Sequence, residues 1–501
     1  MTDRHPYPIL VLLVVLLSVQ GIVRILNHDA QAAFFDEGYH IRYAMTLWSA
    51  GTPNLHEADG KILLYLWLNL LNTGDASTML FVGRVAVALA SLVTGAGIYL
   101  LGRWLHRPLT GIVALGLYII LPYALFYERM AMADPFAAMW VVLVAWRSLV
   151  FARKPSLRNT IITGALIAAA TLAKLTVAIV LALPLLAIIA SGRWRTRRQA
   201  RHYATQLAIM AAVVGLLWSP LLVRLAIDTD VLYLNRTLIA NRSAGYSLLD
   251  VWRATQPALD DYLLPYTLAV VVIGYGALGM VRRPRVQGFM LGWLLCMLVF
   301  PLFLTQVANS RYFVPIAPPL VLVVAIALMS LRRRWQQIAG AVPVVLWCVG
   351  FALPVSYTTV TAPQELRLSA INAALYQNGG LTVDAGIRQT AATLNQIHAG
   401  ERVLVTHRLC YLIFYEMQVP IECLPYLAPH QRLADVLTQV DTGEIIYLLL
   451  NRTAPFYQRV DGVQHQLLAR FERDHIANPV EMYHLWYIEG DTNDADQRET
   501  R

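Results

Sequence analysis

Two adjacent acids follow the first apolar run of the chain. Asp36 and Glu37 lie between Phe35 and Gly38, and Tyr39 comes next. Acids placed between aromatic side chains contribute little to solubility, whereas a carboxylate at a membrane surface can take a proton from a hydroxyl group as a general base. A solvated pair of loop acids is the alternative interpretation. We take Asp36 as the candidate base, with Glu37 beside it.

A further acid and three isolated cations stand beside other apolar runs. Asp134 precedes Pro135, so capping of a helix is an alternative to a role in chemistry. Lys61, Lys174 and Arg311 are far apart in the chain. Such cations can hold a phosphate by charge-assisted hydrogen bonds without a glycine-rich loop, and snorkelling towards the membrane surface is the alternative. We predict a phosphate site, to which we add Arg129.

Signals for other chemistry are weak. His56 and Asp59 are weak candidates for a divalent metal, because the histidines are scattered and no His and Cys cluster has metal-ligand spacing. A metal stays possible, and no cofactor is assigned. The chain has no Walker loop, GxSxG elbow or HExxH motif, which argues against nucleotide-driven transport, serine hydrolysis and zinc proteolysis.

The composition is that of a membrane protein. Hydrophobic residues make up 57% of the 501 residues and charged residues 14%, against about 25% charged in soluble proteins. A membrane helix needs about 20 predominantly apolar residues. We predict eleven such runs, near 8–26, 78–101, 109–126, 133–151, 159–172, 174–191, 205–224, 266–281, 288–304, 313–331 and 338–357. One apolar stretch must break by a tight turn at Lys174.

Arginines between alternate runs predict the topology. The loops near 103–107, 153–158, 193–201, 282–285 and 332–334 are basic and should be cytoplasmic by the positive-inside rule. This pattern accounts for the net charge of +9 without a nucleic-acid partner. We therefore expect a multi-pass protein of the cell or inner membrane, with a cytoplasmic N-terminus and the acids near Asp36 outside. The first run is expected to be a retained anchor and not a cleaved signal peptide.

A change of composition near residue 358 predicts a second domain. Strand-like segments at 402–407, 421–424, 444–451 and 482–489 alternate with helical patterns. We expect a transmembrane domain over 1–357 and an extracytoplasmic soluble α/β domain over 358–501. Cys410 and Cys423 could form a disulfide there, but sequence spacing alone leaves this open.

Three segments together resemble the GT-C superfamily of membrane glycosyltransferases, in particular the branch of protein O-mannosyltransferases and lipid A aminoarabinose transferases. The segments are residues 35–40 (FDEGYH), residues 59–71 with Gly83 and Arg84, and residues 129–134. Residues 172–176 and 310–318 are weaker matches. The resemblance covers residues 1 to about 330. It departs from the family where Ile62 and Leu63 replace the usual prolines after Lys61.

The resemblance implies a reaction and a role for each candidate residue. Asp36 would be the base that activates an acceptor hydroxyl, and a polyprenyl-phosphate-linked sugar would be the donor. Lys61, Lys174, Arg311 and Arg129 would hold the donor phosphate, and Asp134 would position the acceptor or help to bind a metal. The transfer would invert the anomeric carbon. The acceptor could be a glycan, lipid or protein. A polytopic lipid or solute transporter and an extracytoplasmic sensor are the competing functions.

Overall fold

The chain is mostly helical and forms two compact units. The computed structural model describes residues 6–48, 61–227, 247–304, 309–377, 381–423, 445–451, 463–473 and 476–487. The first unit comprises Met1–Gln31, Tyr43–Gly74 and Phe81–Asn372, and the second comprises Ala32–Arg42, Asp75–Leu80 and Ala373–Arg501. The sequence-based division at residue 357 stays a prediction. The structure adds to this prediction that the segment carrying Asp36 belongs to the same unit as the C-terminal residues.

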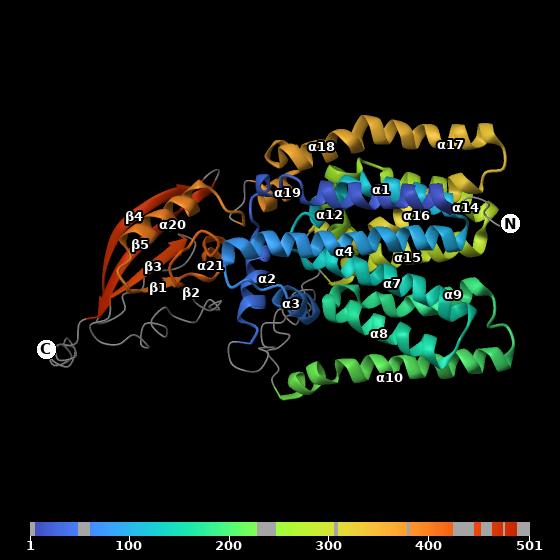
Figure 1. Ribbon diagram of the computed structural model, residues 1–501, viewed down its shortest axis with the longest axis horizontal. Coiled ribbons are helices and arrows are strands. Elements are labelled where there is room, and N and C mark those ends of the chain that lie inside the picture. Colours follow the sequence, from blue (N-terminus) through green and yellow to red (C-terminus); the bar gives the residue numbers. More distant parts are fainter. Residues whose placement is uncertain are drawn as a thin grey trace. The chain divides into compact units, whose positions relative to one another are not determined.

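Helices build the first unit, and Figure 1 shows α7, α8 and α10 side by side within it. The longer elements are α1 (Pro6–Ile25), α4 (Ala76–Leu105), α5 (Pro108–Ile119), α7 (Ala133–Arg153), α8 (Leu157–Ala173), α10 (Arg197–Ile227), α12 (Leu248–Leu263), α15 (Pro284–Leu304), α16 (Ala317–Ser330) and α17 (Arg334–Trp347). The shorter ones are η1 (His28–Ala30), α3 (Ile62–Asn69), α6 (Pro122–Glu128), η2 (Leu175–Ala182), α9 (Leu183–Ser191), α13 (Thr267–Ala269), η5 (Val270–Tyr275), α14 (Gly276–Arg282), η6 (Ser310–Ile316), η7 (Cys348–Ala352), α18 (Leu353–Thr361) and η8 (Pro363–Glu365).

The apolar helices account for membrane insertion. Within the described residues, six helices are long and apolar enough to cross a membrane, or up to eight if each of two bent pairs is one span. The bent pairs are α5 with α6, at 65°, and α12 with the helix from Thr267 to Arg282, at 83°. Large apolar side chains such as Leu216 and Ile273, each 72% exposed, need a lipid environment. Eleven spans stay a prediction, whereas the break at Lys174 is confirmed, because α8 ends at Ala173 and η2 begins at Leu175.

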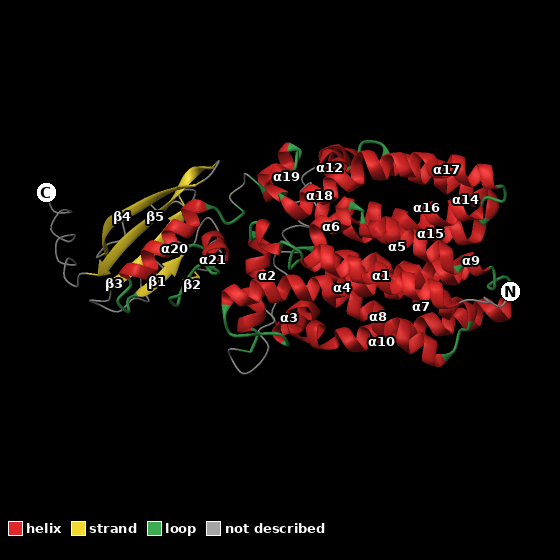
Figure 2. Cartoon of the chain, turned by 45° about the horizontal axis from the view of Figure 1, so that its top comes forward, coloured by secondary structure: helices red, strands yellow, loops and turns green. Residues whose placement is uncertain are grey.

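A five-stranded mixed sheet forms the core of the second unit (Figure 2). Its order is β2-β1-β3-β5-β4, with β1 parallel to β2 and β3, and β5 antiparallel to β3 and β4. The strands are β1 (Arg402–Val405), β2 (Glu422–Cys423), β3 (Ile445–Asn451), β4 (Val463–Arg473) and β5 (Ile476–Tyr487). Helices α20 (Ala385–Ile397) and α21 (His407–Ile413) pack on the sheet. The remaining helices, α2 (Phe35–Thr46) and α19 (Ala370–Tyr376), each have residues in both units.

The sheet confirms the predicted mixture of helices and strands at the C-terminus and adds a strand. Each of the four strand-like segments overlaps a strand, but β4 was missed, because its apolar residues Leu467 and Leu468 are adjacent and both exposed, so they do not follow the strand alternation of buried apolar and exposed polar residues. The open question of the cysteines is answered by the disulfide between Cys410 in α21 and Cys423 in β2, whose Cα atoms are 5.6 Å apart. This bond ties α21 to the sheet edge.

Candidate active site

The candidate base lies in the first turn of a short, anchored helix. Phe34 forms an antiparallel bridge with Thr382, and the Phe35 amide donates to the carbonyl of Leu381 at 2.8 Å. Helix α2 then begins at Phe35, so Asp36 lies at its second position. Backbone pairing immediately before the helix fixes where this turn stands within the second unit.

The two adjacent acids have different surroundings. Glu37 is 0% exposed, and one of its carboxylate oxygens accepts a hydrogen bond of 3.0 Å from the amide of Phe34, the residue before the helix. This is the return half of a capping box, which satisfies an amide that the helix itself leaves unpaired. Asp36 is partly exposed. Glu37 therefore has a structural role at the helix start, and Asp36 is the more accessible carboxylate.

A close backbone contact explains the glycine that follows. A Cβ atom on Gly38 would lie 1.9 Å from the carbonyl oxygen of Tyr411 in α21. The Tyr411 ring also packs edge-on against Phe35 and Tyr39, with centroid distances of 5.3 and 5.2 Å. Only glycine lets α2 approach α21 this closely. Since Tyr411 follows Cys410, the disulfide restrains the helix that contacts the Asp36 turn.

In the first unit, Asp134 and Lys174 form a buried ion pair. The ammonium nitrogen of Lys174 lies 2.5 Å from a carboxylate oxygen of Asp134, and the two side chains are 7% and 3% exposed. Met132, and not Asp134, is the cap residue of α7, and its side chain makes no capping hydrogen bond. Asp134 instead lies in the first turn, and Lys174 stands at the break between α8 and η2. The helix break thus places Lys174 beside Asp134.

Two further predicted cations gather around this pair. The Lys174 nitrogen lies 4.6 Å from the ring centroid of Tyr312, and the guanidinium carbon of Arg311 lies 5.2 Å from the same ring. Lys61 and Arg311 are both close enough to act electrostatically on Lys174. We call Lys61, Lys174 and Arg311 the cation cluster. It brings positive charge from three distant parts of the sequence to one place.

A hydrogen-bonded network holds the segment that carries Arg311. The backbone carbonyl of Ser310 accepts from Tyr123, and its hydroxyl lies 2.5 Å from that of Tyr127 and 2.9 Å from the side-chain oxygen of Asn372. The amide of Asn372 in turn donates to Asp261 at 2.7 Å. Tyr123, Tyr127, Ser310 and Asn372 are buried, and Asp261 is half-buried. A fully bonded polar network of this kind gives η6, and with it Arg311, a defined position.

Comparison with known proteins identifies the fold. Residues 63–218 match the family model for dolichyl-phosphate-mannose-protein mannosyltransferase. The structure of ArnT from Cupriavidus metallidurans bound to undecaprenyl phosphate superposes with a TM-score of 0.62 at 15% identity, over 95% of this chain and 98% of that one. The chain has the fold of the GT-C glycosyltransferases. This confirms the predicted superfamily, and the family match together with the fold indicates a multi-pass membrane glycosyltransferase.

A second solved structure agrees with this assignment. The archaeal oligosaccharyltransferase AglB from Archaeoglobus fulgidus, in complex with an inhibitory peptide and a dolichol-phosphate, gives a TM-score of 0.52 at 12% identity, over 88% of this chain and 69% of that one. None of the curated protein sequences compared with the chain matches it. Neither the family match nor the fold supports the alternative of a transporter.

Arg129 of this glycosyltransferase makes hydrogen bonds within the helical unit. Its guanidinium donates at 2.7 to 2.9 Å to the carbonyls of Val23, Leu26 and Asn27 at the end of α1. The preceding Glu128 pairs with Arg24 at 2.8 Å, and both side chains are 0% exposed. Sequence reasoning missed Arg24, although an arginine near the end of an apolar run was a signal for such a partner. Together these contacts hold the α6–α7 connection from which Asp134 emerges.

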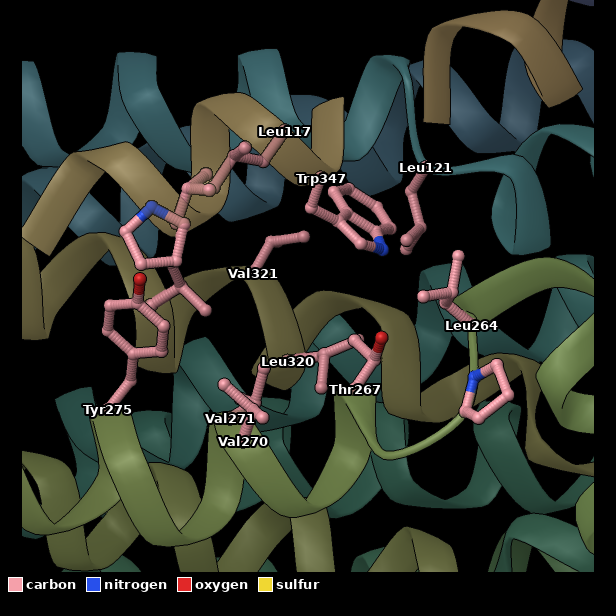
Figure 3. Close-up of a pocket in the computed structure, with 14 residues that line it drawn as sticks. Leu117, Leu121, Leu264, Thr267, Val270, Val271, Tyr275, Leu320, Val321 and Trp347 are labelled. Carbon is pink, nitrogen blue, oxygen red and sulfur yellow. The ribbon is translucent and has the colours of Figure 1, made fainter. Parts of the chain in front are cut away.

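A cavity of about 270 Å³ lies elsewhere in the helical unit of the glycosyltransferase (Figure 3). Its lining is apolar apart from Thr267, Tyr275 and Trp347, and none of the lining residues is charged. Thr267 and Trp347 donate to the carbonyl of Leu263, where α12 ends. Thr267 and Trp347 therefore satisfy the helix break, Tyr275 donates to the carbonyl of Gly340, and the remaining surface suits a hydrocarbon chain.

The described residues form no metal cluster, and the candidate site residues belong to two units. The weak metal candidates His56 and Asp59 lie outside the described residues. Among the residues that the structure describes, no group of three or more His, Cys, Asp or Glu could hold a metal ion. Asp36 and Glu37 belong to the second unit, and the cation cluster with Asp134 belongs to the first.

Proposed function

We propose that this glycosyltransferase moves a sugar from a polyprenyl-phosphate donor to an acceptor hydroxyl at the outer face of the membrane, with inversion at the anomeric carbon. The observation that carries the proposal is the cation cluster of Lys61, Lys174 and Arg311 beside Tyr312. A lipid phosphate as leaving group needs positive charge where its own negative charge develops. The related ArnT structure contains undecaprenyl phosphate, which has this chemistry.

Asp36 is the proposed base. Its carboxylate takes the proton of the acceptor hydroxyl while that oxygen bonds to the anomeric carbon, and the bond from this carbon to the phosphate oxygen breaks. The polyprenyl phosphate leaves with the bonding electrons. A single displacement inverts the carbon and needs one base together with positive charge, in contrast to the acid and base pair of a glycosidase.

Asp134 has a proposed supporting role that its contact suggests. Its ion pair with Lys174 holds the ammonium group in one orientation, so the nitrogen can receive a phosphate without first losing rotamer freedom. Positioning of the acceptor or help in binding a metal, the roles implied by the family resemblance, stay predictions. We leave Arg129 out of the proposed phosphate site, because three carbonyls already accept its hydrogen bonds.

The proposed location at the outer face has independent support. The disulfide between Cys410 and Cys423 is a bond that persists in oxidising compartments and is rare in the cytosol. We therefore keep the predicted topology, with a cytoplasmic N-terminus and the second unit outside the cell or inner membrane. The acceptor is proposed only as a hydroxyl group on a glycan, lipid or protein.

Transfer by the purified full chain tests the function. Synthetic polyprenyl-phosphate pentoses and hexoses would be incubated with lipid, peptide and glycan acceptors, and the anomeric configuration of the product read by NMR. We expect one donor and acceptor pair to give a product of inverted configuration. Retention of configuration would contradict the single displacement. Movement of intact donor across proteoliposomes, with no transfer to any acceptor, would instead support a transporter.

Gly38→Ala tests whether the contact with α21 positions the base. The added methyl group would meet the Tyr411 carbonyl oxygen at 1.9 Å, so α2 has to move. A displacement of about 1 Å at a reacting group can cost on the order of a hundredfold in rate, and we expect a loss of this size with donor binding unchanged. Gly116→Ala is the matched control, since a Cβ on that helical glycine meets nothing within 4 Å. Equal activity of both variants would show that the contact has no positioning role.

A further inference from the structure

Four arginines line one pocket at the face that the sequence predicts to be cytoplasmic. The pocket has a volume of about 410 Å³ and is formed by the α14–α15 turn and the end of α16. Its lining consists of Arg282, Arg283, Pro284, Arg285, Val286, Ser330 and Arg332. The proposed transfer reaction uses none of these residues.

The positive charge of this pocket has no acidic counterpart in the described part of the chain. No ion pair there joins Arg282, Arg283, Arg285 or Arg332 to an acid. The positive charge of Arg283 also acts on His106. The pKa of His106 falls to about 4 through burial and through the nearby charges of Arg283 and Arg107. An anion in the pocket would offset this repulsion.

The donor geometry suits a phosphate. Guanidinium groups present planar pairs of N–H donors that match phosphate oxygens, and they keep their charge at all physiological pH values. Arg285 and Val286 also lie in the first turn of α15, after Pro284, so the positive end of the helix dipole is at the same place. Several donors of fixed charge therefore surround one volume.

Apolar side chains next to these arginines favour a lipid over a soluble phosphate. Val281, which precedes Arg282, is 79% exposed, and Trp335, three residues after Arg332, is 62% exposed. Tryptophan concentrates where membrane and water meet, and basic pockets between membrane helices bind anionic head groups. We propose that the arginine pocket binds the phosphate head group of an anionic membrane phospholipid.

Lipid binding to the detergent-solubilised full chain tests this site by native mass spectrometry. We expect phosphatidylglycerol to bind at least about tenfold more tightly than phosphatidylcholine. Arg283→Gln/Arg285→Gln/Arg332→Gln should weaken phosphatidylglycerol binding by about a hundredfold or more, since each surface arginine contributes on the order of a factor of five. Arg197→Gln/Arg198→Gln/Arg201→Gln removes the same charge from exposed positions at the start of α10, and should keep wild-type affinity.

The remaining outcomes overturn the proposal. Equal losses in both triple variants would mean that basic residues attract lipid without a site. Equal binding of the two lipids by the wild type would exclude head-group recognition, and displacement of phosphatidylglycerol by equimolar glycerol phosphate would assign the pocket to a soluble anion.

Ser330→Glu provides a variant that keeps every arginine, and its new carboxylate in the pocket should lower phosphatidylglycerol affinity at least about tenfold.

Discussion

Asp36→Asn should lower the rate of sugar transfer by about a thousandfold while the affinity for undecaprenyl phosphate stays at the wild-type value. Asparagine keeps the size of the side chain but cannot take a proton, and removal of a general base typically costs 10²- to 10⁴-fold, as order-of-magnitude values. Single-turnover transfer and direct binding of undecaprenyl phosphate are the two measurements. They separate the chemical step from donor recognition.

Two controls assign this effect to one carboxylate. Glu37→Gln keeps an oxygen that can accept the hydrogen bond of the Phe34 amide, so the helix start should persist and most of the activity should remain. Asp29→Asn changes an acid whose side chain is 87% exposed and should have no effect. If Glu37→Gln abolished transfer and Asp36→Asn did not, the base would be Glu37.

Lys174→Met should weaken undecaprenyl phosphate binding by about ten- to a hundredfold and should also destabilise the fold. The first effect follows from loss of a charged donor, for which hydrogen bonds contribute roughly 1.5–3 kcal/mol. The second follows because Asp134 would be left buried without its partner, which typically costs about 3–5 kcal/mol. Binding is measured with undecaprenyl phosphate and stability by thermal unfolding.

A double variant separates these two effects. Lys174→Met/Asp134→Asn removes both charges, so most of the lost stability should return, whereas the affinity for undecaprenyl phosphate should stay low. Lys154→Met is the matched control, because this lysine is exposed and stands just after α7. Recovery of wild-type affinity in the double variant would mean that Lys174 serves the fold and does not bind phosphate.

The sequence indicated candidate site residues, which stay predictions, but not the contacts that these residues make. Lys61, Lys174 and Arg311 stood out because isolated cations beside apolar runs are costly unless they are used or paired. The ion pairs could not be predicted, since Asp134 lies 40 residues from Lys174, and, in a second pair, Glu128 lies 104 residues from Arg24. Glu37 was predicted as the neighbour of the candidate base and Arg129 as part of the phosphate site, and the structure gives each of them hydrogen bonds that hold a helix end.

The fold shows the same division between local and long-range information. The length of the apolar runs determined that the chain is a membrane protein, and the break at Lys174 and four of the five strands were evident, because helix and strand periodicities are local properties of sequence. Only the tertiary structure decided that the residues before Asp36 pair with residues 381–383, that Gly38 meets Tyr411, and that four arginines enclose one pocket. Each of these depends on contacts between distant segments, which packing selects and no local pattern encodes.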